Sequence, residues 1–304
     1  MASIKDLRVR IKSVGSIKQI TRAMEMVATT KLRRFQDNAV SSRPYAQEIT
    51  GLVGRLAAVL GEDALDRPLF KQGAGKRKLV LVVSSDRGLC GAYNSNLFRV
   101  LEDWVDEDPA TRDPQKAPLE AQPVYFIYGR KASQYMSKRG FNIGRYLKEP
   151  PLESIDYRNA AITAQMLQNE FLSGEYSDVS ILYSAFETMA KYVPALVPFL
   201  PVSADALGDQ GADDEVGKDS DVILEPDAET IFDQLIPRYL ETRIYNALLE
   251  ALTSEYASRR FAMKNATDAA TDMQKELQGI YNRKRQENIT KELLDIVGAT
   301  EAVS

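Results

Sequence analysis

The 304-residue sequence has no histidine, a single cysteine, a single tryptophan and no long apolar run. Without imidazole, histidine metal sites, Ser-His and Cys-His nucleophile pairs and the commonest general base are all excluded. The lone Cys90 excludes an internal disulfide and suits a reducing compartment. The longest apolar runs, such as 79–83, fall far below the roughly 20 residues of a membrane span. The composition therefore argues against an enzyme, and we predict no catalytic residue, no cofactor and no metal site.

Charge is unevenly distributed along the chain, although the net charge is only −4. Residues 3–34 carry nine basic side chains against Asp6 and Glu25, whereas residues 203–229 carry ten acidic side chains against Lys218. A basic amino-terminal helix is compatible with a nucleic-acid or membrane-surface partner. It is equally the pattern of a solvated helix face or of one that meets an acidic protein, and no aromatic residues interleave with these charges.

Both ends of the sequence follow a helical pattern. Ser3 and Asp6 form a variant of the capping box. Apolar residues then recur at spacings of three and four: Ile4, Leu7, Ile11 and Val14. After a three-residue offset, which predicts a stammer in a coiled coil, the pattern resumes at Ile17, Ile20, Met24 and Val27. Pro44 predicts an interruption of this helix, which is expected to restart and reach residue 60.

The carboxyl-terminal segment repeats more regularly. From residue 245 the positions of an a/d seam alternate by four and three: Leu249, Leu252, Tyr256, Arg259, Met263, Ala266, Ala270, Met273, Leu277 and Ile280. A helix over 238–297 would be about 90 Å long, which exceeds the roughly 50 Å diameter of a globule of this chain length. We therefore expect it to form an antiparallel pair with the amino-terminal helix. Dimerisation with the same helix of a second copy is the alternative.

The middle of the chain alternates strand and helix patterns. Apolar strand runs at 79–83, 124–128, 141–147 and 179–185 are separated by helical segments, which favours a mostly parallel, Rossmann-like α/β domain. Three prolines place the last apolar run, 193–202, at a sheet edge. The expected division is an N-terminal coiled-coil helix (1–60), an α/β domain (76–203), an acidic insertion (204–226) and a C-terminal coiled-coil helix (227–304).

The loop 86–94 follows the first strand, at a turn where nucleotides often bind. Gly88 and Gly91 lack the third glycine of a dinucleotide fingerprint, and no Lys-Ser or Lys-Thr follows to complete a phosphate loop. The two glycines are better explained as tight-turn residues that let a helix pack on its strand. A nucleotide-dependent enzyme that uses this loop is one open reading, and a nucleic-acid-binding module that uses the basic helix is another.

Three segments carry a specific resemblance: ITRAMEMVA (20–28), SDRGLCGAYN (85–94) and YNRKRQENITKEL (281–293). In this order they resemble the gamma subunit of F-type ATP synthase, and the resemblance covers essentially the whole chain. It implies a non-catalytic rotor shaft, whose terminal helices form an antiparallel coiled coil inside a hexamer of alpha and beta subunits. The expected partners are the alpha, beta and epsilon subunits and the c-subunit ring, with one copy per complex and no nucleic acid.

The resemblance also implies roles for single residues. Met24 matches a methionine near the lever region of the catalytic subunits, and Arg259 matches an arginine opposite it. Arg285 and Gln286 match a polar catch with a beta-subunit loop, and Thr290 belongs to the same region. Glu225 resembles an acidic contact to the ring.

No signal or transit peptide pattern opens the sequence. With the resemblance, this predicts a peripheral protein at the cytoplasmic face of a bacterial plasma membrane. The paired regulatory cysteines of the chloroplast type are absent, so no thiol switch is expected.

Overall fold

The computed structural model describes residues 3–107, 122–188, 191–203 and 225–301. The chain divides into a coiled-coil unit, residues 1–30 with 259–304, and an α/β unit, residues 31–258. Most of the expected acidic insertion, residues 204–224, lies outside the described residues. Within the described ranges, no helix is both long and apolar enough to cross a membrane.

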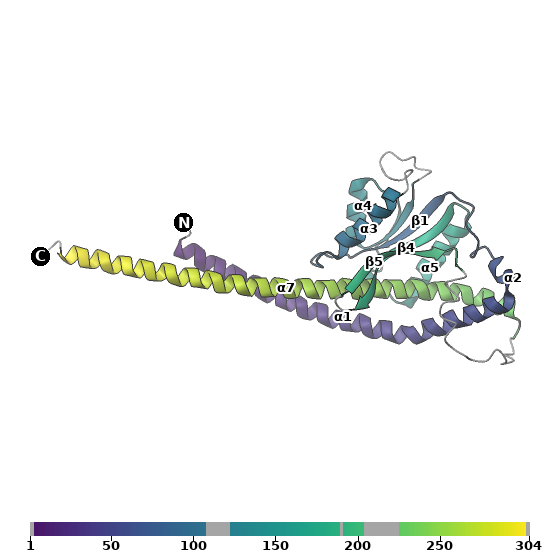
Figure 1. The fold of residues 1–304 in the computed structure, drawn as a ribbon, viewed down its shortest axis with the longest axis horizontal. Coiled ribbons are helices and arrows are strands. Elements are labelled where there is room, and N and C mark those ends of the chain that lie inside the picture. The colour runs from purple at the N-terminus through teal and green to yellow at the C-terminus, as the bar shows by residue number, and fades with distance from the viewer. Residues whose placement is uncertain (1–2, 108–121, 189–190, 204–224, 302–304) are drawn as a thin grey trace. The chain divides into compact units, whose positions relative to one another are not determined.

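Two long helices begin and end the chain: α1 (Ile4–Leu60) and α7 (Ala228–Glu301). At the start of α1, the Asp6 N–H donates to the Ser3 hydroxyl (3.2 Å) and the Ser3 N–H donates to the Asp6 carboxylate (3.1 Å), which confirms the predicted capping box. Hydrogen bonds from the Ser3 backbone and hydroxyl lower the pKa of Asp6. Within the coiled-coil unit the two helices run antiparallel (Figure 1), so the predicted intrachain pair is present and the α7 seam is covered by α1.

The predicted break at Pro44 is wrong, because α1 continues through it to Leu60. Proline removes one helical hydrogen bond and costs roughly 3 kcal/mol in a helix interior. Tertiary packing on both sides offsets this cost: Ser42 donates to the Asn246 side chain (3.2 Å), and Ile49 and Val53 are buried.

The α/β unit contains one five-stranded sheet in the order β3-β2-β1-β4-β5. The strands are β1 (Arg77–Val83), β2 (Val124–Tyr128), β3 (Ile143–Leu147), β4 (Tyr176–Thr188) and β5 (Lys191–Leu200). The first four are parallel, and β5 pairs antiparallel with β4 at the edge. The sequence therefore predicted both the mostly parallel sheet and the proline-bearing edge strand.

Helices cover both faces of this sheet. The helices α3 (Tyr93–Glu107) and α4 (Arg130–Arg139) lie on one face, and α5 (Tyr157–Leu172) lies on the other (Figure 1). On the first face, the buried side chains of β1 and β2 pack with those of α3 and α4: Val80, Val82, Leu97, Leu101, Ile127 and Met136. Short elements complete the unit: α2 (Glu62–Leu65) and the 3-10 helix η1 (Leu152–Ser154).

The strand order reverses between β1 and β4, which makes the carboxyl end of β1 a topological switch point. In open α/β sheets this is where a crevice forms and ligands usually bind. The loop that follows β1 is the one with Gly88 and Gly91. Its surroundings therefore decide whether the unit has room for a nucleotide.

Candidate functional site

The interior of the coiled-coil unit is only partly apolar. On α1 the buried and half-buried positions continue at spacings of three and four without an offset: Leu7, Ile11, Val14, Lys18, Thr21, Glu25 and Ala28. The predicted stammer is wrong, since Ile17, Ile20 and Val27 are 52%, 59% and 57% exposed. Two helices in continuous contact need an unbroken seam of period 3.5, and this constraint outweighs the burial of three apolar side chains.

Polar contacts fix the register of the pair. The Thr267 hydroxyl donates to the Thr21 hydroxyl (2.8 Å), and Arg8 donates to the Tyr281 hydroxyl (3.3 Å). Beyond Ala270, the half-buried residues of α7 are those that this register places opposite α1. Met273 and Ile280, which the sequence placed in the seam, are 53% and 43% exposed, whereas Gln274 and Tyr281 are half-buried.

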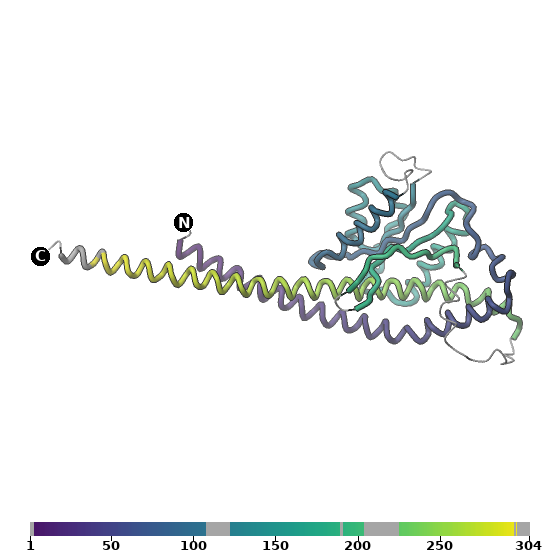
Figure 2. The backbone as a smooth tube through the Cα atoms, in the orientation of Figure 1, coloured from purple at the N-terminus to yellow at the C-terminus, as the bar shows by residue number. Residues whose placement is uncertain are grey.

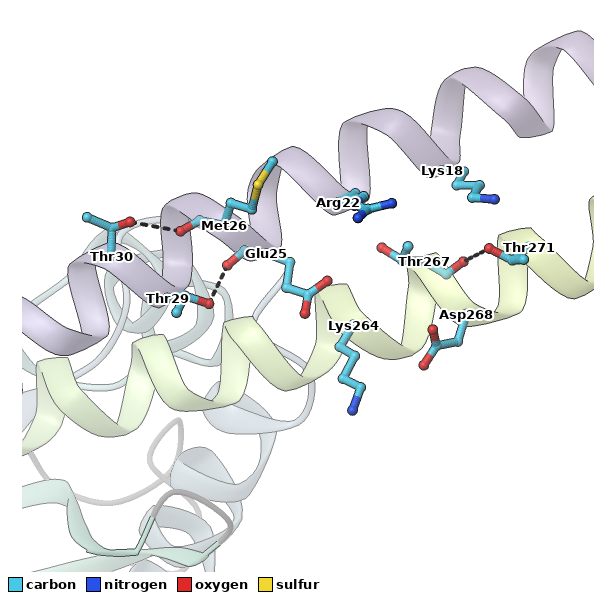
Figure 3. A pocket seen from close by; sticks show the side chains of 10 residues that line it. All are labelled: Lys18, Arg22, Glu25, Met26, Thr29, Thr30, Lys264, Thr267, Asp268 and Thr271. Atoms are coloured by element: carbon cyan, nitrogen blue, oxygen red, sulfur yellow. Dashed lines mark hydrogen bonds between the residues drawn. The ribbon is translucent and has the colours of Figure 1, made fainter.

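One side of the coiled-coil unit is hollowed into a polar groove of about 740 Å3 (Figure 3). Side chains of both charges contribute to its lining, together with Met26 and threonine hydroxyls from both helices: Lys18, Arg22, Glu25, Lys264 and Asp268. A second groove of about 500 Å3 shares Lys18 and Arg22 with the first. The grooves form because small and polar seam residues do not fill the space between the helices as leucines would.

The opposite side of the same pair is apolar. At about 100° per residue, Ile17, Ile20 and Val27 fall on one side of the α1 seam, and Arg22 and Met26 fall on the other. Each helix has its own seam. In an antiparallel pair, residues of the two helices that are rotated away from their own seams in the same direction lie on the same side of the pair. Met273 and Ile280 of α7 therefore lie on the side of the α1 stripe, and Lys264 lies on the groove side. We call these surfaces the apolar face and the groove face.

The residues singled out by sequence resemblance fall in three places. Arg259 is buried at 6% exposure and Met24 is half-buried on α1. The register set by Thr21 and Thr267 places Met24 level with residue 264, so Arg259 lies five residues further towards the start of α7.

The remaining candidates are exposed. Arg285, Gln286 and Thr290 lie on the carboxyl-terminal part of α7, in the coiled-coil unit. This part of α7 continues beyond the amino-terminal end of α1 (Figure 2). Glu225 belongs to the α/β unit, just before α7 begins, and is not brought together with the others.

The switch point of the sheet is occupied by α7 rather than open. The Ser258 hydroxyl donates to the Cys90 carbonyl (2.6 Å) in the loop after β1, and the Ser254 hydroxyl donates to the Ser184 carbonyl (2.9 Å) on β4. The buried Tyr93 hydroxyl donates to the Ala251 carbonyl (3.2 Å). One helix thus bridges the ends of both strands that flank the crevice.

The start of α4, which follows β2, is capped by residues at the carboxyl end of β1. At the start of α4, the Arg130 N–H donates to the Asp86 carboxylate (3.0 Å), and the Ala132 N–H donates to the Ser84 hydroxyl (2.9 Å). The Lys131 N–H donates to the Ser85 carbonyl (3.0 Å). A helix start binds anions through free N–H groups, so this one is already capped. The loop that contains Gly88 and Gly91 contacts α7 through the Cys90 carbonyl.

The described geometry defines a class of protein: an antiparallel two-helix coiled coil made from both chain ends, with a doubly wound α/β domain inserted between them in sequence. Comparison with known proteins narrows this class. The ATP synthase family model matches residues 3–303. The ATP synthase gamma chain of Mycobacterium tuberculosis is 42% identical over 320 residues, which cover 100% of this chain and 98% of that one.

A second relative, the ATP synthase gamma chain of Cytophaga hutchinsonii, is 37% identical over 305 residues and covers both chains fully. The chain belongs to the ATP synthase gamma-chain family. Solved structures share its fold. A chain of the Euglena gracilis mitochondrial ATP synthase, determined as OSCP/F1/c-ring, superposes with a TM-score of 0.62 at 20% identity, and covers 99% of this chain and 94% of that one.

Sequence reasoning missed the groove residue Lys18, because apolar residues alone were used to trace the α1 seam. Counting by threes and fours from Leu7 without an offset reaches Lys18, Thr21 and Glu25. That continuous count is the sequence signal by which the inward-facing polar residues could have been found.

Proposed function

We propose that this chain is the rotating central shaft of a proton-translocating F-type ATP synthase. The shaft turns inside a hexamer of alternating alpha and beta subunits and couples proton flow through the c-subunit ring to ATP synthesis or hydrolysis on the beta subunits. One copy serves the complex, and the chain has no active site of its own. Residues 1–60 and 227–304 supply the shaft, and residues 76–203 supply the domain beside the epsilon subunit and the ring.

The observation that carries this proposal is the two-faced coiled coil. At one level along its axis, the coiled coil presents Ile17 and Ile20 on the apolar face. At the same level on the other side, it presents Arg22 and Lys264 on the groove face. A rod of this kind offers a different surface to each of three equivalent partners that surround it. Each partner is then biased towards a different state by its own contact free energy, and turning the rod exchanges the three states.

The carboxyl-terminal end of α7 supports the same function. By the register, residue 4 lies level with about residue 284 or 285, so later residues have no α1 neighbour. Ile289, Leu293 and Ile296 are 48%, 58% and 63% exposed there. An exposed apolar helix end normally marks a surface for another protein. We assign it to the hexamer, with Arg285, Gln286 and Thr290 as the polar catch at its base.

We assign Met24 and Arg259 to the region that meets the lever of the catalytic subunits, and Glu225 to the ring. Nucleotide chemistry belongs to the beta subunits. The filled switch point and the capped start of α4 support this division of labour. The place of action is the cytoplasmic face of a bacterial plasma membrane, where the chain is held by its partners.

The decisive experiment is reconstitution with alpha and beta subunits of the same source. We expect three alpha, three beta and one copy of this chain to purify together. A bead attached to the α/β unit should turn in one direction when ATP is added. A complex that hydrolyses ATP with the bead stationary would overturn the proposal.

The catch is tested separately by R285A with Q286A in the full ATP synthase. We expect ATP synthesis driven by a proton gradient to fall while the free subunit stays folded, because charge-assisted hydrogen bonds to a partner are lost. A control pair with the same chemistry, Gln278→Ala with Arg283→Ala, removes exposed side chains of the same helix outside the catch. Equal losses in the two pairs would contradict the assignment of Arg285 and Gln286.

A further inference from the structure

Glu153 joins three elements of the α/β unit at one point. It lies in η1, between β3 and α5. Its carboxylate accepts hydrogen bonds from the Lys31 ammonium group on α1 and from the Tyr256 hydroxyl on α7. Lys31 Nζ also lies 3.2 Å from the Tyr256 hydroxyl. Both long helices are therefore bonded to the same carboxylate of the α/β domain.

Further contacts reinforce the junction. The Glu153 carbonyl accepts a hydrogen bond from Arg34 on α1 (3.2 Å). The Tyr256 ring packs against Phe35 at a centroid distance of 5.4 Å, and the Lys31 ammonium group lies 5.3 Å from the centroid of the Tyr256 ring. The side chains of Lys31 and Glu153 are only 30% and 22% exposed. Charges in such a place are retained only with well-placed partners.

The electrostatics show that the carboxylate is held in its charged form. Burial alone would raise the pKa of Glu153. The hydrogen bonds from Lys31 and Tyr256, with the positive charges of Lys31 and Arg87, outweigh burial and lower its pKa. The Glu153 carboxylate is therefore ionised at neutral pH.

The junction is placed where both helices leave the α/β unit. Lys31 is the first residue of that unit and Ser258 is its last, so Tyr256 lies within three residues of its end. Beyond these points the same two helices continue as the coiled-coil unit.

We propose that Glu153 is a torque clamp, a positioning residue that fixes α1 and α7 to the α/β domain where the helices pass into the coiled coil. This inference rests on the proposed rotary function. During rotation the coiled coil is loaded by the hexamer, and the α/β domain is loaded by the ring. If one helix twisted against the domain, part of the rotation angle would be lost between the ring and the hexamer. A carboxylate that is bonded to both helices resists that twist.

The test measures torsional stiffness in the assembled complex. The hexamer is fixed to a surface, and a bead is attached through S137C, an exposed position on α4. The angular variance of the bead is recorded while the complex waits for ATP. Two variants weaken the clamp: E153Q, which keeps the shape, and Y256F, which removes only the hydroxyl bonded to Glu153. The control E187Q makes the same charge change in an ion pair with Lys191 that lies within the β4–β5 hairpin.

We expect E153Q to raise the angular variance, since the neutral amide makes weaker hydrogen bonds with Lys31 and Tyr256 than the carboxylate does. Y256F should raise it as well, because it removes the hydroxyl that donates to Glu153. E187Q should leave the variance unchanged. A role in folding alone would lower the unfolding temperature of the variants without changing the variance.

The outcomes separate this inference from the proposed function. If the wild-type bead turns and neither variant changes the variance, the clamp is overturned and the rotary function stands. If the wild-type bead does not turn, the proposed function fails. If E153Q does not assemble, Y256F decides the question, because it keeps the Phe35 contact and the charges of the junction.

Discussion

Thr267 donates a 2.8 Å hydrogen bond to Thr21 across the interior of the coiled-coil unit, at a point where a leucine pair would be expected in a stable two-helix seam. The Thr21 hydroxyl in turn lies 3.1 Å from the Lys18 carbonyl. Half-buried polar pairs of this kind specify register at a cost in stability, because an axial slip breaks the bond between the two hydroxyl groups. The threonine pair therefore favours one axial alignment of the two helices. This alignment fixes the position of the apolar face relative to the groove face.

The threonine pair can be tested by a double-mutant cycle. T267V alone should lower the free energy of unfolding by about 1 kcal/mol, the usual net value of one hydrogen bond. T21V with T267V should cost less than the sum of the single changes, since two apolar side chains of the same shape then face each other. Urea unfolding followed by circular dichroism measures the cycle. Strict additivity would mean that the two hydroxyls do not interact.

Two glycines should respond in opposite ways to alanine. Gly129 has φ 93°, and a Cβ atom there would lie 2.1 Å from the Ser84 carbonyl oxygen. G129A should therefore destabilise by roughly 3 kcal/mol or more, or prevent soluble expression. At Gly15, inside α1, the nearest atom to a new Cβ is the flexible end of Gln274 at 3.3 Å. G15A should raise stability by up to about 1 kcal/mol through helix propensity. Thermal unfolding of the two variants compares these expectations directly.

Glu250 and Glu153 should give opposite pH dependences. Burial raises the pKa of Glu250 despite hydrogen bonds from the Phe186 N–H and the Tyr183 hydroxyl. A raised carboxyl pKa means that stability is lost as the pH rises through the folded value, so E250Q should gain stability relative to wild type between acidic and neutral pH.

For Glu153 the sign is reversed. Its lowered pKa stabilises the fold above the ordinary value of 4.5, and this contribution is lost as the pH falls below it. E153Q should therefore lose stability at pH 7 and differ least from wild type in acid. Unfolding midpoints between pH 3 and pH 8 measure both variants. Parallel curves for E250Q, E153Q and wild type would contradict both assignments.

The isolated protein should bind no nucleotide at the loop after β1. Ser258 holds the Cys90 carbonyl, and Asp86 and Ser84 cap the start of α4. Equilibrium dialysis with labelled ATP and ADP tests this. Stoichiometric binding that disappears in G88A with G91A would restore the nucleotide-enzyme interpretation of the loop.

The composition and local pattern predicted much of the fold. The apolar runs of β1, β2 and β4 lie within the observed strands, and the prolines of β5 placed it at the sheet edge. These features are local, since a run of β-branched and aromatic residues fits a buried strand whatever surrounds it. The three motifs at 20–28, 85–94 and 281–293 also sufficed to identify the family. The roles of Met24, Arg259, Glu225, Arg285, Gln286 and Thr290 stay predictions.

The sequence by itself determined that the two chain ends form long seamed helices and that the middle forms a mostly parallel sheet. Only the tertiary structure decided which residues face inward, because burial in a helix pair depends on the partner. Ile17 and Ile20 are more apolar than Lys18 and Thr21, yet they face outward, since contact with α7 requires an unbroken seam and α7 offers Thr267 at that level. The same is true of the bonds that Glu153 receives from Lys31 and Tyr256, whose positions are more than 100 residues apart along the chain. No local pattern contains such a junction, because only the packing of α1, η1 and α7 brings the three side chains together.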